Sequence, residues 1–264
     1  MKKTAMVTAG SSHTGLEISK KFASEGYNLI ITSRNKDKSQ NAVDEIQKTY
    51  PGTKVFSVQI ELTSVESIKT AFSKIKEEFK AIDVFVANAA HLGVDLDIYN
   101  TTEDDFDAVF DTNVKGTFFC CREAARLMKN GGTIVTLGSV QSKGAVEGRT
   151  VYGASKAALS ALTKYLAYDL APLNIRANCV ISGAIHTTRW DNLDPKDLEK
   201  RRENYLTGRE STTEEVANAV YYLASPLSSS VTGTEIVVDS GLLTSILPYA
   251  NRKVKNHDDF LCKE

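Results

Sequence analysis

Short apolar runs rich in β-branched residues alternate along this chain with longer segments whose apolar residues recur every three or four positions. The short runs have the length and composition of buried strands, and the longer segments have the period of helices that cover a sheet. The predicted strands are Thr4–Thr8, Asn28–Thr32, Lys54–Gln59, Val84–Ala87, Thr133–Leu137, Arg176–Val180 and Glu235–Val238. The predicted helices are Gly15–Glu25, Lys38–Tyr50, Val65–Phe79, Phe106–Met128, Tyr152–Leu170 and Thr213–Ala224. This alternation predicts an α/β fold with a doubly wound parallel sheet of about seven strands and helices on both faces.

The alternation continues without a linker rich in proline, glycine or serine, and no internal repeat divides it. We therefore predict one domain over residues 1–247, followed by a charged tail at 248–264. A polar, charged insertion, Ser182–Arg209, interrupts the rhythm after the sixth predicted strand. Because an insertion there would lie over the carboxyl edge of the sheet, we expect it to form a substrate lid.

Composition narrows the class of protein. Apolar residues make up 42% and charged residues 25% of the chain, which excludes a disordered or fibrous protein. The formal charge of −1 gives no electrostatic reason to expect nucleic acid or an anionic membrane as a partner. The histidines and cysteines lack metal-ligand spacing, so no metal site is predicted. Reduced buried thiols and an N-terminal apolar run too short for a signal peptide predict a cytoplasmic protein.

Tyr152 and Lys156 stand four residues apart near the start of the fifth predicted helix. A helix places them one turn apart on the same face. A nearby ammonium stabilises a phenolate and lowers the pKa of a tyrosine from its usual value of about 10. The pair therefore predicts a general acid that exchanges its proton near neutral pH. The same spacing also occurs in ordinary surface pairs, so the prediction depends on the residues around it.

Other polar or small residues follow the carboxyl ends of predicted strands, where ligands of open parallel sheets bind. The first strand leads into TAGSSHTGLE, Thr8 to Glu17, which is either a tight turn or a turn that presents backbone N–H groups to a pyrophosphate. Asn88 follows the fourth strand and Ser139 the fifth, and Asn113 lies in an otherwise apolar helix, where its amide needs a partner. Together these positions predict a binding crevice at one edge of the sheet.

The second strand ends in Thr32, Ser33 and Arg34, at the place where an NAD-binding fold usually has an acidic residue for the ribose. A hydroxyl and a guanidinium suit a 2′-phosphate better, so we predict NADP (NADPH) as the cofactor, with NAD as the disfavoured alternative. The competing interpretation is an exposed arginine that opens a basic loop.

In this order and spacing, these motifs resemble the short-chain dehydrogenase/reductase family, from the first strand to about Gly241. The resemblance implies a Rossmann-like domain in which Tyr152 is the catalytic acid/base and Lys156 its partner, which also holds the nicotinamide ribose. It further implies that Ser139 orients the substrate carbonyl and that Asn113 holds a water connected to Lys156.

The resemblance also implies a cofactor site, with Asn88-Ala89-Ala90 matching the family's N-A-G and the segment from Ser182 to Thr187 matching its P-G-x-I-x-T. The implied cofactor-binding residues are Gly10, Ser11, Ser12, His13, Thr14, Gly15, Ser33, Arg34, Glu61, Leu62, Asn88, Ala89, Tyr152, Lys156, Ile185 and Thr187.

The chain departs from the family pattern mainly in its glycine turn. The family's T-G-x-x-x-G-x-G would place glycines at positions 9, 13 and 15, whereas this chain has Ala9, His13 and Gly15. Ala9 carries a methyl where a positive φ can be needed, and Gly10 is an alternative residue for the turn. The imidazole of His13 either turns to solvent or faces the pyrophosphate.

The leading hypothesis is therefore an NADP-dependent oxidoreductase that interconverts a carbonyl and a secondary alcohol, with Tyr152 as acid/base. The alternative is a catalytically silent cofactor-sensing regulatory or scaffold protein on the same fold, which the altered glycine turn favours. A hydrolase is disfavoured because G-x-S-x-G does not occur. The expected partners are a small carbonyl or alcohol substrate and further copies of the chain, as a homodimer or homotetramer.

Overall fold

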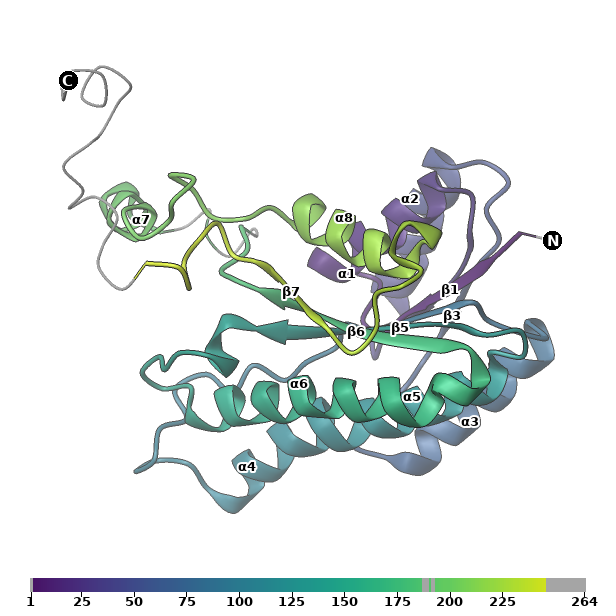
Figure 1. Ribbon diagram of the computed structural model, residues 1–264, viewed down its shortest axis with the longest axis horizontal. Helices are drawn as coiled ribbons and strands as arrows, with labels where there is room; N and C mark the ends of the chain where they lie inside the picture. The colour runs from purple at the N-terminus through teal and green to yellow at the C-terminus, as the bar shows by residue number, and fades with distance from the viewer. Residues whose placement is uncertain (1, 187–189, 191–192, 246–264) are drawn as a thin grey trace.

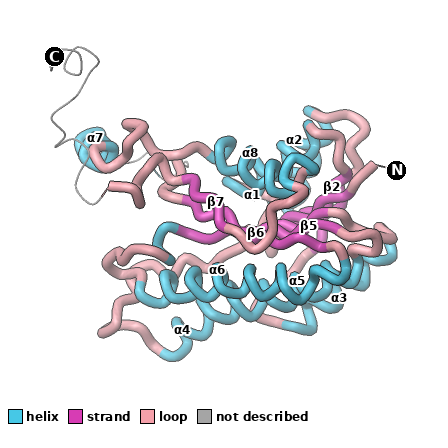
Figure 2. The backbone as a smooth tube through the Cα atoms, viewed as in Figure 1, coloured by secondary structure: helices cyan, strands magenta, loops and turns pink. Residues whose placement is uncertain are grey.

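The sheet has the predicted parallel, doubly wound arrangement. The computed structural model describes residues 2–186, 190 and 193–245. Within that part, seven parallel strands form one sheet in the order β3-β2-β1-β4-β5-β6-β7 (Figures 1 and 2). The strands are β1 (Thr4–Val7), β2 (Asn28–Thr32), β3 (Val55–Val58), β4 (Val84–Ala87), β5 (Gly132–Ser139), β6 (Ile175–Ser182) and β7 (Glu235–Val238). The predicted fold class is confirmed.

Helices cover both faces of the sheet. In Figure 1, α1, α2 and α8 lie on one side, and α3, α5 and α6 on the other, with α4 continuing the second layer. Their bounds are α1 (His13–Ser24), α2 (Lys36–Thr49), α3 (Val65–Glu78), α4 (Glu103–Phe110), α5 (Thr117–Leu127), α6 (Thr150–Leu170), α7 (Pro195–Arg202) and α8 (Thr213–Ala224). None of the described helices is long and apolar enough to span a membrane.

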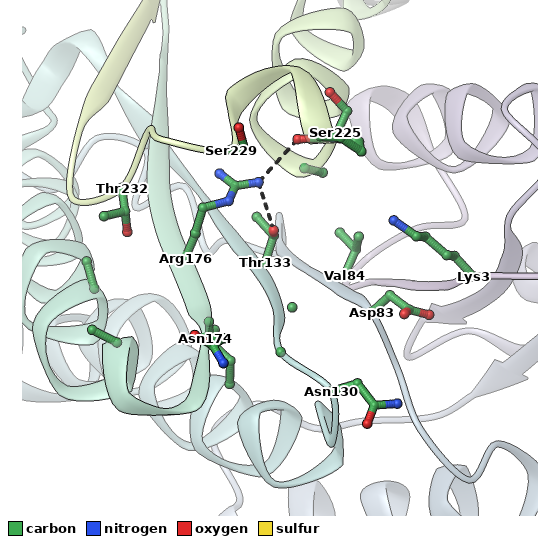
Figure 3. A pocket seen from close by; sticks show the side chains of 17 residues that line it. Lys3, Asp83, Val84, Asn130, Thr133, Asn174, Arg176, Ser225, Ser229 and Thr232 are labelled. Carbon is green, nitrogen blue, oxygen red and sulfur yellow. Dashed lines mark hydrogen bonds between the residues drawn. The ribbon is translucent and has the colours of Figure 1, made fainter.

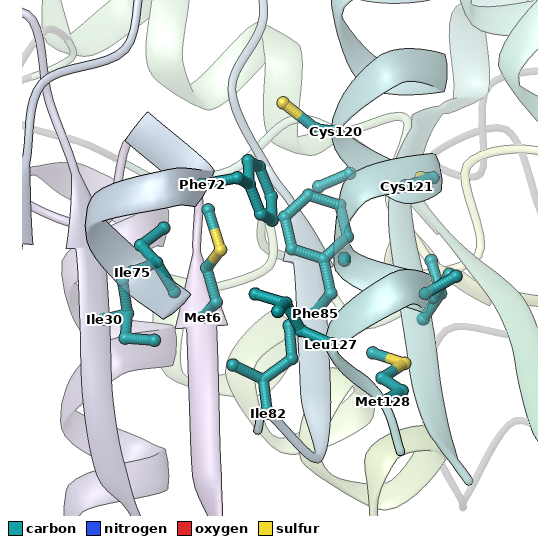
Figure 4. Close-up of a cluster of buried hydrophobic side chains, with 14 of the residues drawn as sticks. Met6, Ile30, Phe72, Ile75, Ile82, Phe85, Cys120, Cys121, Leu127 and Met128 are labelled. Atoms are coloured by element: carbon teal, nitrogen blue, oxygen red, sulfur yellow. The ribbon is translucent and has the colours of Figure 1, made fainter. Parts of the chain in front are cut away.

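Alternation along the strands divides the core into two layers. Successive side chains of a strand point to opposite faces of the sheet. Met6 of β1 and Ile30 of β2 therefore share one cluster with Phe72 of α3 and Cys121 of α5 (Figure 4). Val7, one residue further along β1, packs on the other face against α1 and α8. Strands buried on both faces explain why the predicted strands read as continuous apolar runs.

The predicted helix Phe106–Met128 is wrong in its start and in its regularity, because it is not one continuous α-helix. It begins earlier, at Glu103, and residues Asp111–Gly116 form a π-helical segment between α4 and α5. Apolar periodicity does not reveal such a segment, because one extra residue only shifts the pattern. At Gly116 the segment passes close to the β3–α3 connection, where a Cβ would lie 2.5 Å from the carbonyl oxygen of Leu62.

The insertion Ser182–Arg209 contains a helix that the sequence analysis did not predict. Helix α7 begins after Asp194, whose side chain accepts a hydrogen bond from the backbone N–H of Lys196, and Pro195 occupies its first position. A capping aspartate followed by proline is a recognised helix start, so the signal was present in the sequence.

Candidate functional site

The crevice at the carboxyl ends of β1 and β4 is fixed by Thr8. β1 and β4 are neighbours at the point where the strand order reverses, which is where open α/β sheets bind ligands. The hydroxyl oxygen of Thr8 accepts hydrogen bonds from the backbone N–H groups of Asn88 and Ala89, at 2.9 and 3.0 Å. The side-chain amide of Asn88 donates to the carbonyl oxygen of Thr8 at 3.0 Å. The ends of the two strands are therefore joined by both backbone and side-chain hydrogen bonds.

The turn after β1 places two non-glycine residues in the left-handed region. The φ angle is 50° at Ala9 and 46° at His13, and Gly10 does not adopt a positive φ. Gly10 therefore does not take over the turn, and Ala9 itself adopts the conformation that favours glycine. Left-handed backbone costs a residue with a Cβ about 1–2 kcal/mol. Both strained residues stand where the family pattern has glycine.

Two neighbouring cavities extend along this crevice. The first, of about 260 Å³, extends toward the end of β2, and the second, of about 270 Å³, extends toward α6. Both are lined by Ala9, Ser12, Ala89 and Ala90, so they meet at the turn after β1. A trough of this shape across the switch point suits an elongated, two-part ligand such as a dinucleotide.

The first cavity contains the predicted residues at its β2 end and two cations. Of the predicted cofactor residues it contains Ser11, Ser12, Ser33, Arg34, Glu61, Leu62 and Ala89. Lys38, the third residue of α2, also lines it. Lys38 was predicted as the first residue of a helix and, only in the competing interpretation of Arg34, as part of an exposed basic loop, so its place in the cavity was not anticipated; it follows Arg34 by four residues.

The second cavity contains the proposed catalytic pair and the start of α1. Of the predicted residues it contains Ser12, His13, Thr14, Gly15, Asn88, Ala89, Tyr152, Lys156 and Ile185. His13 is exposed and is the first residue of α1. Gly10 lines neither cavity; a Cβ there would come within 2.9 Å of Ile31 and Ser19, so it allows close packing of α1 on β2. Thr187 lies outside the described residues.

Tyr152 and Lys156 lie together on the first two turns of α6. Lys156 is 3% exposed, and its ammonium donates a 2.7 Å hydrogen bond to the carbonyl oxygen of Leu137 in β5. The same nitrogen lies 5.6 Å from the centroid of the Tyr152 ring. Burial of a charge is costly unless it is hydrogen-bonded, so the bond to Leu137 fixes the ammonium beside the phenol.

Asn113 lies behind this pair and is fully hydrogen-bonded. Its side-chain oxygen accepts from the backbone N–H of His91 at 2.7 Å, and its amide donates to the carbonyl oxygen of His91 and to the hydroxyl of Ser155, at 3.0 and 2.9 Å. Ser155 lies between Tyr152 and Lys156 on α6. Asn113 therefore connects the loop after β4 to α6 from within the π-helical segment, a form of helix frequent at functional sites. No direct contact of Asn113 with Lys156 is observed.

Ser139 ends β5 at the same edge of the sheet. It is 7% exposed, and its hydroxyl oxygen accepts a hydrogen bond from the N–H of Gln141. Leu137 and Gly138, the two residues before it, line the second cavity, whereas Ser139 does not. The structure thus places Tyr152 and Lys156 in the cavity, with Asn113 and Ser139 at its back and edge.

A larger hollow of about 550 Å³ lies at the opposite edge of the sheet, where the strands begin (Figure 3). There Arg176 donates hydrogen bonds to the hydroxyl of Thr133 and to the carbonyl oxygens of Leu223 and Ser225. Burial lowers the pKa of this guanidinium. Because carbonyl groups at the end of α8 satisfy it, Arg176 has a structural role, and none of the proposed catalytic or cofactor residues lines this hollow.

Comparisons with known proteins agree with this geometry. A profile of the family described as enoyl-(acyl carrier protein) reductase matches residues 9–243. The chain is 34% identical over 244 residues to the 3-oxoacyl-(acyl-carrier-protein) reductase FabG of Aquifex aeolicus, covering 91% of this chain and 97% of the relative. It is 31% identical over 239 residues to a 3alpha-hydroxysteroid dehydrogenase of Mediterraneibacter gnavus, covering 90% and 95%.

Among solved structures, YwfH, described as an NADPH dependent reductase involved in bacilysin biosynthesis, superposes with a TM-score of 0.88. It is 27% identical, and the match covers 93% of this chain and all of that one. The chain therefore belongs to the short-chain dehydrogenase/reductase family, whose members are oxidoreductases that use a nicotinamide cofactor. The relatives are named as reductases and dehydrogenases, so a catalytically silent protein is not the favoured interpretation.

Proposed function

We propose that this protein interconverts a carbonyl and a secondary alcohol with NADPH as the hydride donor and Tyr152 as the acid/base. The observation that carries the proposal is the position of Tyr152 and Lys156, side by side in a cavity at the switch point of the sheet. A titratable hydroxyl beside a buried ammonium is suited to proton transfer at the place where a nicotinamide would bind.

We assign each of these residues a separate role in the reaction. The bound nicotinamide would supply or accept the hydride. The hydroxyl of Tyr152 would give its proton to the carbonyl oxygen during reduction and take it back during oxidation. Lys156, held by Leu137, would keep a positive charge beside that hydroxyl. The hydroxyl of Ser139 would donate a hydrogen bond to the same substrate oxygen, where negative charge develops.

The preference for NADPH is proposed from the β2 end of the trough. Arg34 and Lys38 both line that cavity, and Ser33 stands at the end of β2 in place of an acid. Two cations and a hydroxyl suit a 2′-phosphate, which an acidic residue there would repel. The hydroxyl of Ser33 donates to the carbonyl oxygen of Asn35, so Arg34 and Lys38 are the principal groups for the phosphate.

The substrate is proposed only as a class. FabG is named for a 3-oxoacyl group on a carrier protein and the second relative for a hydroxysteroid, and the chemistry they share is a ketone and a secondary alcohol. We extend that shared chemistry to this chain. We also propose that residues 1–247 act as one catalytic domain, that the insertion Ser182–Arg209 covers the substrate, and that the protein works as a dimer or tetramer.

The test is a panel of ketones and secondary alcohols assayed with NADPH, NADP, NADH and NAD by the absorbance of the reduced nicotinamide. The wild type should turn over at least one ketone faster with NADPH than with NADH. Tyr152→Phe should keep its fold and its NADPH affinity but lose about 10²-fold or more in kcat, the contribution typical of a general acid. Near-normal turnover in Tyr152→Phe would contradict the assignment of this residue.

A further inference from the structure

Glu210 is a buried carboxylate that joins three parts of the chain. Its side chain is 3% exposed and lies just before Ser211 and Thr212, the residues that lead into α8. One carboxylate oxygen lies 2.8 Å from Nδ1 of His186, which follows β6. Arg202, the last residue of α7, donates to both carboxylate oxygens at 3.1 Å. The exit of β6, the end of α7 and the start of α8 therefore meet at one charge.

This carboxylate stays ionised despite its burial. Its hydrogen bonds to Arg202 are the main reason that its pKa falls to about 2, against the effect of burial. A buried charge is tolerated only where it is paired and hydrogen-bonded. The positions of His186 and Arg202 are therefore closely tied to the carboxylate of Glu210.

The same segment carries a residue of the second cavity. Ile185 lines that cavity together with Tyr152 and Lys156. Ile185 pairs with Ser211 in a short parallel bridge, and the N–H of His186 donates to the carbonyl oxygen of Ser211 at 2.9 Å. In an extended segment, neighbouring side chains point to opposite sides. Ile185 therefore faces the cavity while His186 faces Glu210.

We propose that Glu210 is a positioning residue for the nicotinamide half of the cofactor, acting through His186 to hold Ile185 in place beside Tyr152 and Lys156. The inference rests on the NADPH-dependent function proposed above. It requires that loss of the carboxylate weakens contacts at the α6 end of the trough and leaves the β2 end unchanged. Arg202, which is 43% exposed, contributes as a second attachment of the same carboxylate.

The experiment compares two ligands that share one half. NADPH would occupy both ends of the trough, whereas adenosine 2′,5′-bisphosphate has the adenosine and the 2′-phosphate but no nicotinamide. Both are titrated calorimetrically into the wild type, Glu210→Gln and Arg202→Ala. The matched control is Glu215→Gln, which removes a carboxylate that pairs with Arg209 six residues away and does not contact His186.

Glu210→Gln should raise the Kd for NADPH by about 3- to 30-fold, the range in which substitutions remote from a ligand alter its binding. Its Kd for adenosine 2′,5′-bisphosphate should stay within about twofold of the wild-type value. Arg202→Ala should change NADPH binding in the same direction by a smaller factor, and it provides the test if Glu210→Gln does not fold.

Equal losses for both ligands, or the same selective loss in Glu215→Gln, would overturn the inference, because either result would indicate general destabilisation. Unchanged NADPH binding in Glu210→Gln would also overturn it, while leaving the proposed function intact. A wild type that binds the bisphosphate and NADPH equally weakly and turns over no ketone would refute the proposed function itself, and the inference with it.

Discussion

The carbonyl oxygen of Ala9 fills the space that a side chain at Gly15 would need: a Cβ on Gly15 would lie 2.1 Å from that oxygen. The amide nitrogen of Asn88 would lie 2.6 Å from the same Cβ. These are backbone and fixed side-chain atoms, so the turn before α1 depends on the missing Cβ at position 15.

Gly15→Ala should therefore destabilise the protein by about 1–3 kcal/mol, the usual cost of overpacking, and should weaken NADPH binding as the turn moves. Urea unfolding measures the first effect and a binding titration the second. Gly144→Ala is the matched control, because a Cβ at Gly144 meets no atom within 4 Å. Similar losses in both variants would show that the contact at Ala9 is not the cause.

Replacing the strained residues of the turn by glycine should stabilise the protein. Ala9→Gly and His13→Gly should each stabilise the protein by about 0.5–1 kcal/mol, because relief of the left-handed strain exceeds the entropy that glycine costs. The exposed helical control Ala161→Gly should lose about 1 kcal/mol. Thermal unfolding of the three variants measures the sign, and a loss in all three would refute strain at the turn.

Arg34→Ala should cost about 1.5–3 kcal/mol of NADPH affinity, on the scale of a charge-assisted hydrogen bond, with little change for NADH. Lys38→Ala should also weaken the binding of NADPH more than the binding of NADH. Lys36→Ala is the control, since Lys36, the first residue of α2, lies two residues from Lys38 and does not line the cavity. The measurement is a titration of both cofactors, and equal losses for NADPH and NADH in Arg34→Ala would show that the arginine does not contact the phosphate.

Acid should remove part of the stability that Glu210 provides. Hydrogen bonds from Arg202 lower the folded-state pKa of Glu210 to about 2, below its value in the unfolded chain. A lowered carboxylate pKa stabilises the fold above the unfolded pKa, and this contribution is lost as pH falls toward the folded value. The difference in unfolding free energy between the wild type and Glu210→Gln should be constant above about pH 5 and shrink toward about pH 2. A difference that does not change over this range would contradict the role of the charge.

Exposed aromatic residues on one layer of helices predict self-association. Phe118 of α5 and Tyr165 and Tyr168 of α6 are 42%, 69% and 82% exposed, while Leu159 of α6 is buried. Large exposed apolar side chains gathered on one layer usually meet a partner. Sedimentation should show a dimer or tetramer, and Tyr165→Glu with Tyr168→Glu should shift it toward monomer without loss of helical circular dichroism. A wild type that stays monomeric at micromolar concentration would contradict this prediction.

Much of the fold was readable because each strand and helix carries its own periodicity. The predicted bounds of β2, β4, β7 and α8 are those observed. The π-helical segment was not readable, because apolar periodicity carries no signal for it, and its Asn113 contacts His91 and Ser155, which are 22 and 42 residues away in sequence. Helix α7 was missed although its start signal was present, because the surrounding segment is polar and has no apolar stripe.

The candidate site could be predicted as a set of residues and not as a set of contacts. Spacing brought Tyr152 and Lys156 together, since a single helix carries both. The left-handed backbone of Ala9 was anticipated only through the family pattern, because alanine itself gives no signal for it. The grouping of Glu210 with His186 and Arg202 was invisible in the sequence, because it depends on where three separate elements meet.

The π-helical segment also acts as a phase shift between the two regular helices that it joins. One residue of an α-helix corresponds to a rotation of about 100°, so a chain one residue shorter between Asp111 and Gly116 would turn α4 by that angle relative to α5. Packing of α4 on α6 and packing of α5 on α3 would then exclude each other. The extra residue therefore sets the relative rotation of the two helices, and at this rotation the amide of Asn113 contacts both the loop after β4 and α6.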